Sequence, residues 1–156
     1  MNAMIESRLQ ELGLSLPTQL PPLANYVPYV KVESLVFISG QIPSWNGKIN
    51  YIGKLGRDFS IEDGQKAAHL CALNILAQLK RACEENGTQI IRCVRLGGFI
   101  HSTDDFKEQS QVMNGASDLM VAIFGEKGHH TRAAVGVNAL PLGVAVEVEA
   151  IFEVKK

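Results

Sequence analysis

One arginine and several glutamates lie within an otherwise small and aliphatic stretch near the C-terminus, residues 129–154 (HHTRAAVGVNALPLGVAVEVEAIFEV). A guanidinium can bind a carboxylate through two parallel hydrogen bonds, and a nearby glutamate can polarise a water molecule. Arg132 and Glu147 are therefore candidates for binding a small carboxylate and promoting its reaction with water. The same charges are also compatible with the solvated face of a sheet, because most charged strand residues face water.

The residues around these charges alternate in type and predict two strands. Between positions 144 and 154 aliphatic residues alternate with glutamates, which is the period of a half-buried strand. A second alternating segment covers 132–138, and the intervening Leu-Pro-Leu-Gly at 140–143 has the composition of a turn. We expect the two strands to pair as a hairpin, in which Arg132 and Glu147 share one face.

Hydrophobic periodicity along the rest of the chain predicts an α+β fold of order ββαβαββ. The expected elements are strands at 29–32, 35–39 and 90–101, and helices at about 4–13, 61–86 and 104–124. Ser60-x-x-Asp63 is typical of a capped helix start, Gly87 of a helix end, and Asn46-Gly47 of a hairpin turn. The two long helices are expected to pack on one face of a single mixed sheet.

Length and charge indicate one domain and exclude several classes of partner. A chain of 156 residues is large enough to bury a core without disulfides, and a net charge of −1 gives no field that would attract nucleic acid or anionic lipid. The N-terminus carries charges throughout and contains neither a signal peptide nor a membrane span. The three cysteines, Cys71, Cys83 and Cys93, lack C-x-x-C spacing, so we expect a reducing, cytoplasmic location and no zinc site.

Four sequence segments resemble the RidA (YjgF-type) family of imine/enamine deaminases, earlier labelled endoribonuclease L-PSP. They are PY (28–29), SGQIP (39–43), DF followed by a helix containing MNG (113–115), and TRAAVGVNALPLGVAVEVEA (131–150). The resemblance covers roughly 26–154, so we divide the chain into an N-terminal extension with a short helix (1–25) and a RidA-like domain (26–156). It implies a chorismate-mutase-like fold and a homotrimer with ligand pockets in the clefts between subunits.

The resemblance also implies roles for individual residues. The arginine matching Arg132 holds the substrate carboxylate, the glutamate matching Glu147 activates a water, and the tyrosine matching Tyr29 lines the pocket. Gly40, Asn114 and Ala134 match further pocket positions. Hydrolysis of a 2-aminoacrylate-type enamine or imine to a 2-keto acid and ammonia requires no metal or organic cofactor, because binding, orientation and one water suffice.

The residues before the arginine depart from the family pattern. His129-His130-Thr131 stand where the well-defined deaminases carry a proline and a small residue, and the loop at 53–56 and the N-terminal extension resemble the longer branch of the superfamily. His130 is a candidate substrate-binding residue or general base. Consecutive residues of an extended chain point in opposite directions, so the two histidines do not form a simple metal site.

Two classes of function remain open. One is a cofactor-free hydrolase of imines and enamines, acting on small carboxylates. The other is a non-catalytic, chaperone-like trimer or metabolite sensor that binds keto acids at the same arginine. A role on RNA is third, since the paired basic residues are confined to Lys80-Arg81 and Lys155-Lys156, too few to follow a phosphate backbone.

Overall fold

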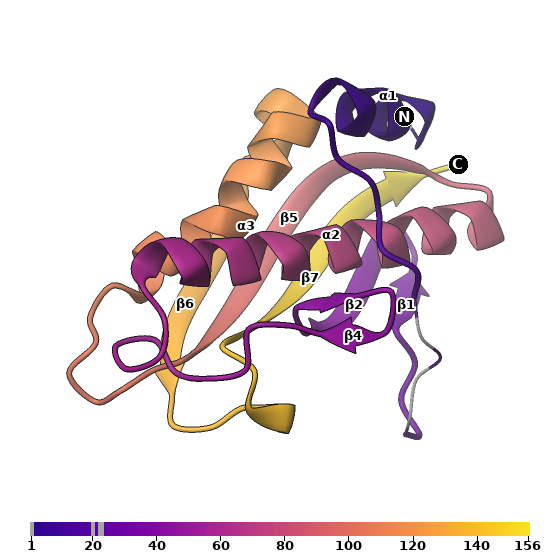
Figure 1. Cartoon of the computed structure of the whole chain (residues 1–156). Coiled ribbons are helices and arrows are strands. Elements are labelled where there is room, and N and C mark those ends of the chain that lie inside the picture. The colour runs from indigo at the N-terminus through magenta and orange to yellow at the C-terminus, as the bar shows by residue number, and fades with distance from the viewer. Residues whose placement is uncertain (1, 20, 22–23) are drawn as a thin grey trace.

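The chain forms a mixed five-stranded sheet with two long helices on one of its faces (Figure 1). The computed structural model describes residues 2–19, 21 and 24–156, so three positions of the Leu-Pro-rich segment at 15–23 lie outside the described residues. The strands, in the spatial order β1-β2-β7-β5-β6, are β1 (Tyr29–Val32), β2 (Leu35–Gln41), β7 (Val146–Lys155), β5 (Gln89–His101) and β6 (Thr131–Val137). This arrangement confirms the α+β class and the placement of both helices on one face.

A small hairpin and a long helix follow the opening strands. The strands β3 (Ser44–Trp45) and β4 (Lys48–Ile49) pair around Asn46 and Gly47, whose positive φ angles of 50° and 86° suit a hairpin turn. Helix α2 (Ile61–Asn86) begins at the expected capping box, in which Ser60 Oγ accepts a hydrogen bond from the backbone N–H of Asp63. It ends at Gly87 in the left-handed conformation, as predicted.

Helix α3 (Gln109–Phe124) begins five residues later than predicted. Thr103 Oγ1 donates a hydrogen bond to Asp105, and the backbone N–H of Phe106 donates to the carbonyl of Thr103, which together form a turn in this segment. Threonine and aspartate side chains compete with helical hydrogen bonding in this way. Phe106 is therefore half-buried in a loop and does not belong to the helix.

The C-terminal strands do not form the expected hairpin. Strand β6 pairs with β5 in parallel, and β7 pairs with the other side of β5 in an antiparallel sense, so that β5 separates the two. The reason is α3, which returns the chain across the sheet after β5 and thereby makes a βαβ unit with parallel strands. Residues 138–145 then cross from one side of β5 to the other, with a short 3-10 turn at Pro141–Gly143.

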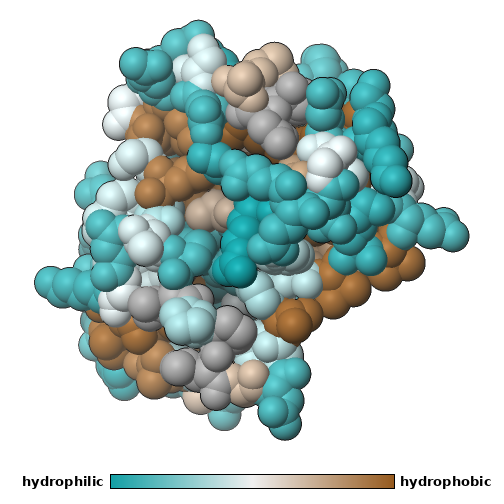
Figure 2. Space-filling model, turned by 90° about the vertical axis from the view of Figure 1, so that its right-hand side faces the viewer, coloured by the Kyte–Doolittle hydropathy of each residue, from teal (hydrophilic) through white to brown (hydrophobic). Residues whose placement is uncertain are grey.

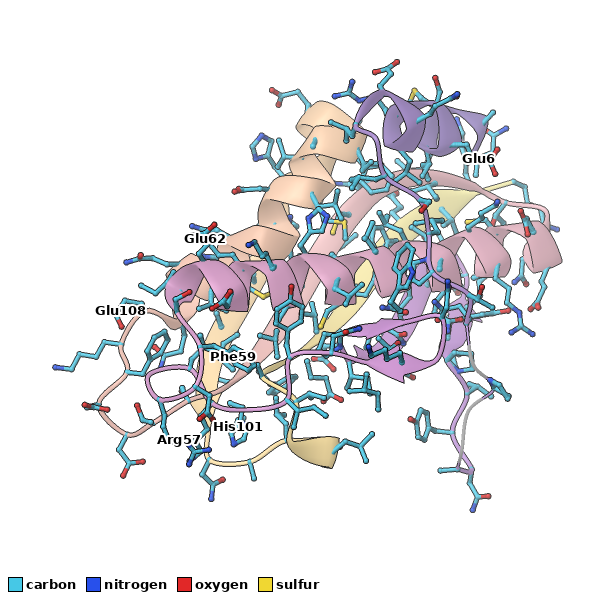
Figure 3. All side chains as sticks on the ribbon, viewed as in Figure 1. Glu6, Arg57, Phe59, Glu62, His101 and Glu108 are labelled. Carbon is cyan, nitrogen blue, oxygen red and sulfur yellow. The ribbon has the colours of Figure 1, made fainter. Side chains whose placement is uncertain are left out.

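The N-terminal helix α1 (Asn2–Glu11) packs on the outer side of the helical layer. Ile5 and Leu9 belong to the same buried core as the long helices, and Arg8 Nε donates a 3.0 Å hydrogen bond to the carbonyl of Ala122 on α3. The labelled Glu6 on α1 and Glu62 at the start of α2 lie on the exterior in Figure 3. The three cysteines are buried free thiols, as expected for small core residues.

The sheet face opposite the helices carries exposed hydrophobic side chains. Val30 is 48% exposed, Val32 53%, Phe37 42% and Val135 47%. Figure 2 views the molecule from its β1 edge and shows hydrophobic groups that reach the surface there. Exposed apolar side chains gathered on one face of a sheet are typical of an interaction face.

Candidate functional site

Arg132 is anchored to helix α3 by three hydrogen bonds. Its Nη1 donates to Asn114 Oδ1 (2.9 Å) and Ser117 Oγ (3.1 Å), and its Nη2 donates to the backbone carbonyl of Ser110 (3.2 Å). A guanidinium has five N–H donors, so two, one on Nε and one on Nη2, make no bond with the described residues. Two donors are what a bidentate carboxylate requires, and the hydrogen bond to Asn114 places this residue beside the arginine.

His130 lies next to this anchor. Its Nε2 is 2.8 Å from Ser117 Oγ, and its Nδ1 is 2.6 Å from the carbonyl oxygen of Gly128. Burial lowers the pKa of His130 below its usual value, the bond to Gly128 opposes the shift, and the positive charge of Arg132 lowers the pKa further. These effects together favour the neutral form of the imidazole.

Glu147 lies on the opposite face of the sheet from Arg132. Arg132 is in register with Leu96 of β5, a core residue that faces the helices, whereas Glu147 is in register with Phe99, three positions later. Side chains alternate between faces along a strand, so residues three apart point in opposite directions. The expectation that Arg132 and Glu147 share one face is wrong within a single chain, because it rested on the hairpin that β5 interrupts.

The carboxylate of Glu147 is half-buried beside Gly40 of β2. A Cβ at Gly40 would come within 2.9 Å of Glu147 Cδ, so the absence of a side chain there makes room for the glutamate. Burial raises the pKa of Glu147, and the neighbouring Glu149 raises it further. Among the described residues the carboxylate has no hydrogen-bond or ion-pair partner, and it remains available to a ligand or a water.

Tyr29 lies far from Arg132 within one chain, whereas Ala134 lies on the same strand as Arg132. Tyr29 is on the edge strand β1, and its hydroxyl donates a hydrogen bond to Glu85 on α2; burial, followed by this carboxylate, raises the pKa of Tyr29 to about 12. Four interstrand spacings of about 4.8 Å separate β1 from β6, so Tyr29 lies roughly 19 Å from Arg132 within one chain. Ala134 lies on the same face as Arg132 and packs against the core.

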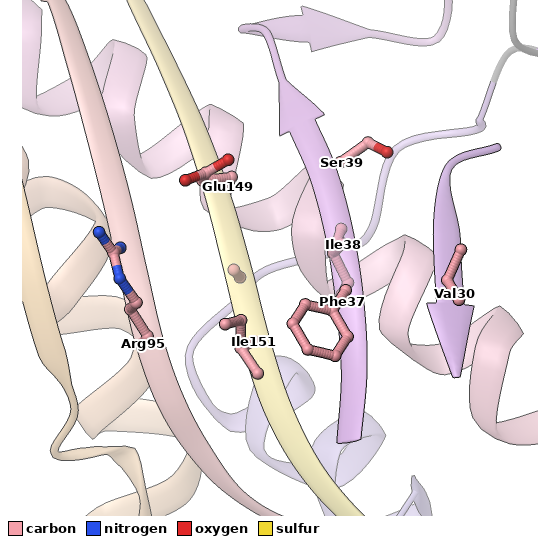
Figure 4. A pocket seen from close by; sticks show the side chains of 8 residues that line it. Val30, Phe37, Ile38, Ser39, Arg95, Glu149 and Ile151 are labelled. Carbon is pink, nitrogen blue, oxygen red and sulfur yellow. The ribbon is translucent and has the colours of Figure 1, made fainter. Parts of the chain in front are cut away.

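Sequence reasoning missed Ser117 and a hollow on the open face. Ser117 follows Asn114 by three residues on α3, and this helical spacing would have identified both as neighbours of one ligand or side chain. The hollow has a volume of about 360 Å³ and is lined by Phe37, Arg95 and Glu149, among others (Figure 4). Figure 4 shows these side chains on the same face, in front of the sheet, with the helices behind it.

The described part of the chain contains neither a metal-type cluster nor a membrane-spanning helix. No group of three or more histidine, cysteine, aspartate or glutamate side chains converges among these residues. None of the helices in the same residues combines the length and the apolar character needed to cross a bilayer.

Comparison with known proteins places this geometry in a family. A family model described as "YjgF/chorismate_mutase-like, putative endoribonuclease" matches residues 6–153. The chain belongs to this family. The match begins inside α1, and the YjgF-type fold therefore accounts for nearly the whole described structure.

Relatives within the YjgF family fall at two levels of similarity. Protein TCP17 of Trypanosoma cruzi is 42% identical over 150 residues, which cover 96% of this chain and 93% of that protein. The crystal structure of Atu1372 from Agrobacterium tumefaciens, a protein of unknown function, has a TM-score of 0.90 at 46% identity and covers 99% of this chain and 94% of its own. E. coli TdcF with bound serine has a TM-score of 0.59 at 26% identity, with 88% and 92% covered. This chain thus resembles the TCP17 and Atu1372 branch more closely than it resembles TdcF.

Proposed function

We propose that the protein hydrolyses reactive imines and enamines of small amino acids to 2-keto acids and ammonia, without a cofactor. The observation that supports this most directly is the anchored guanidinium of Arg132, which keeps two N–H donors for a carboxylate. The reaction adds a water oxygen to the imine carbon and breaks the carbon–nitrogen bond, so that nitrogen leaves as ammonia. Holding the carboxylate places the adjacent imine carbon at a fixed position, which is the main requirement of such a step.

Glu147 is the proposed partner of the water. A carboxylate whose pKa is raised by burial is a stronger base than an exposed one, and it can take a proton from the attacking water. Its lack of a partner among the described residues leaves its oxygens available for this role. Since Arg132 and Glu147 lie on opposite sheet faces, the proposed site contains Arg132 from one copy of the chain and Glu147 from another.

The open sheet face is the proposed contact between copies. Its exposed valines and Phe37 would be removed from water when a second copy packs on it, and burial of apolar area is the general driving force of association. We propose a homotrimer, in which Gly40 would contribute to the cleft from the chain that supplies Glu147. TdcF, a family member with bound serine, shows that a relative accommodates a small molecule with a carboxylate.

Binding of keto acids without catalysis is the second candidate. It is favoured by the fact that the Arg132 anchor is complete within one chain, whereas hydrolysis requires Glu147 from elsewhere. The same trimer would then act as a metabolite sensor or in a chaperone-like manner. The two candidate functions differ in whether the protein converts its ligand chemically or only binds it.

One assay separates the two candidates. 2-Iminobutyrate is generated in the reaction vessel by an amino-acid oxidase, and the rise of 2-oxobutyrate is followed with and without the protein. Faster release that increases linearly with protein concentration supports hydrolysis. An unchanged rate, combined with saturable binding of 2-oxobutyrate in calorimetry, supports the binding role. The absence of both would contradict both candidates.

A further inference from the structure

We propose, on the basis of the function above, that Ser117 and His130 are positioning residues that hold the Arg132 guanidinium in its carboxylate-binding orientation. Neither residue is required to touch the ligand for this role. They act through the hydrogen bonds that connect α3, the 3-10 turn η1 (Gly125–Gly128) and the beginning of β6.

Ser117 Oγ is the central atom of this arrangement. It is 3.1 Å from Arg132 Nη1 and 2.8 Å from His130 Nε2, and the other ring nitrogen of His130 is 2.6 Å from the carbonyl oxygen of Gly128. A continuous series of hydrogen bonds therefore runs from the guanidinium through a hydroxyl and an imidazole to the backbone. All three side chains are partly buried.

The chemistry of the groups determines the direction of each hydrogen bond. A carbonyl oxygen only accepts, so Nδ1 of His130 carries the proton and donates it to Gly128. In a neutral ring Nε2 is then an acceptor, and the hydroxyl of Ser117 must donate to it. Because the hydrogen of Ser117 points at the imidazole, the oxygen lone pairs remain for the guanidinium, which only donates.

His130 thus selects one of the orientations that a serine hydroxyl can otherwise adopt. Without an acceptor at Nε2, the hydroxyl hydrogen can rotate toward Arg132 Nη1, where two donors would face each other. The guanidinium would then keep only Asn114 and the Ser110 carbonyl, and could turn about its Nε–Cζ bond more easily.

Four variants test the proposal in the full-length protein. Ser117→Ala removes the central hydroxyl. His130→Leu removes the Nε2 acceptor and places an apolar side chain at this position. His130→Gln keeps an amide oxygen that can accept from Ser117. The matched control is His129→Leu, because His129 is exposed and its ring has no hydrogen bond to the described residues.

Two measurements are made on each variant. Nitrogen-15 NMR of the ligand-free protein reports the rotation rate of the Arg132 guanidinium, assigned by its loss in Arg132→Lys, and calorimetry reports the dissociation constant for pyruvate. We expect Ser117→Ala and His130→Leu to accelerate the rotation and to weaken pyruvate binding by roughly three- to tenfold, the usual effect of one net hydrogen bond. His130→Gln is expected to stay close to the parent, and His129→Leu to change neither quantity.

The outcomes separate this proposal from the function on which it rests. If Arg132→Lys loses pyruvate binding while Ser117→Ala and His130→Leu rotate and bind like the parent, the positioning role is wrong and the proposed function stands. If the parent neither binds pyruvate nor accelerates keto-acid release, the proposed function fails, and the rotation rates still decide the positioning role because they require no ligand. The positioning role would also be wrong if His130→Leu and His130→Gln weakened pyruvate binding equally and left the rotation rate of the Arg132 guanidinium unchanged.

Discussion

Arg132 and Glu147 lie on opposite faces of one sheet. Arg132 is in register with Leu96 on the helix-covered face and is bonded to α3, whereas Glu147 is in register with Phe99 on the open face. A site that contains both groups therefore contains two copies of the chain. This relationship makes the proposed function depend on assembly.

Mixing two inactive variants tests this dependence. Arg132→Ala and Glu147→Gln chains, unfolded and refolded together in equal amounts, are expected to recover about a quarter of the parental imine hydrolysis. The reason is that about one in four contacts in a randomly mixed ring joins an intact Arg132 to an intact Glu147. The measurement is keto-acid release after refolding, with each variant refolded alone as the control. No recovery, with trimers shown by sedimentation, would contradict a site shared between copies.

Arg132→Lys is expected to weaken the binding of 2-oxobutyrate or pyruvate at least tenfold. Lysine keeps the charge but cannot offer the planar pair of donors, and one charge-assisted hydrogen bond contributes about 1.5–3 kcal/mol. Calorimetry measures the change, and Arg57→Lys on an exposed loop serves as the control. Binding as tight as in the parent would remove Arg132 from the carboxylate-binding site.

Glu147→Gln is expected to leave keto-acid binding largely intact and to abolish imine hydrolysis. The amide keeps the shape of the side chain but cannot take a proton from water. Keto-acid binding and release are compared with those of Glu153→Gln, a variant further along the same strand. Full activity of the Glu147→Gln variant would remove the glutamate from the mechanism.

The pH dependence of stability reports whether the Glu147 carboxylate has a stabilising partner in the folded protein. Burial and Glu149 raise its folded-state pKa above the unfolded value, so ionisation destabilises the folded protein at neutral pH. Glu147→Gln should therefore raise the melting temperature at pH 7, and this gain should shrink as the pH falls through the folded pKa and vanish below the ordinary glutamate value of about 4.3. A lower melting temperature at pH 7 would instead reveal a stabilising partner in the assembled protein.

RNA binding is expected to be weak and insensitive to salt. The net charge of −1 leaves few phosphates that the protein could neutralise, and each neutralised phosphate adds to the salt dependence of binding. Filter binding of a single-stranded RNA at about 50 and 200 mM salt measures this, because several phosphate contacts would change the affinity by orders of magnitude over that range. Tight, steeply salt-dependent binding would favour the third class of function.

Gly115→Ala is expected to destabilise the fold. A Cβ at this position would lie 2.0 Å from the backbone carbonyl oxygen of Gln65 on α2, and backbone cannot move aside as a flexible side chain can. Overpacking typically costs about 1–3 kcal/mol. Chemical denaturation measures the loss, and Ser110→Ala on the exposed start of α3 is the control.

The sequence by itself determined most of the elements and the side chains that are candidates for chemistry. Alternation identified the strands, i, i+4 spacing identified α2, and Ser60 and Gly87 marked its two ends because capping is a local interaction. The segment containing Arg132 and Glu147 was recognisable as a carboxylate-binding candidate from residue types alone.

Only the tertiary structure decided which face each of these residues occupies relative to the other. Alternation relates residues within one strand, whereas the relation between two strands depends on their pairing. The connection at 138–145 is compatible with a hairpin or with a crossing over β5, and α3 selects the crossing by making β6 parallel to β5. The hydrogen bonds from Ser117 to His130 and Arg132 likewise depend on how α3 packs against β6, which no local pattern contains.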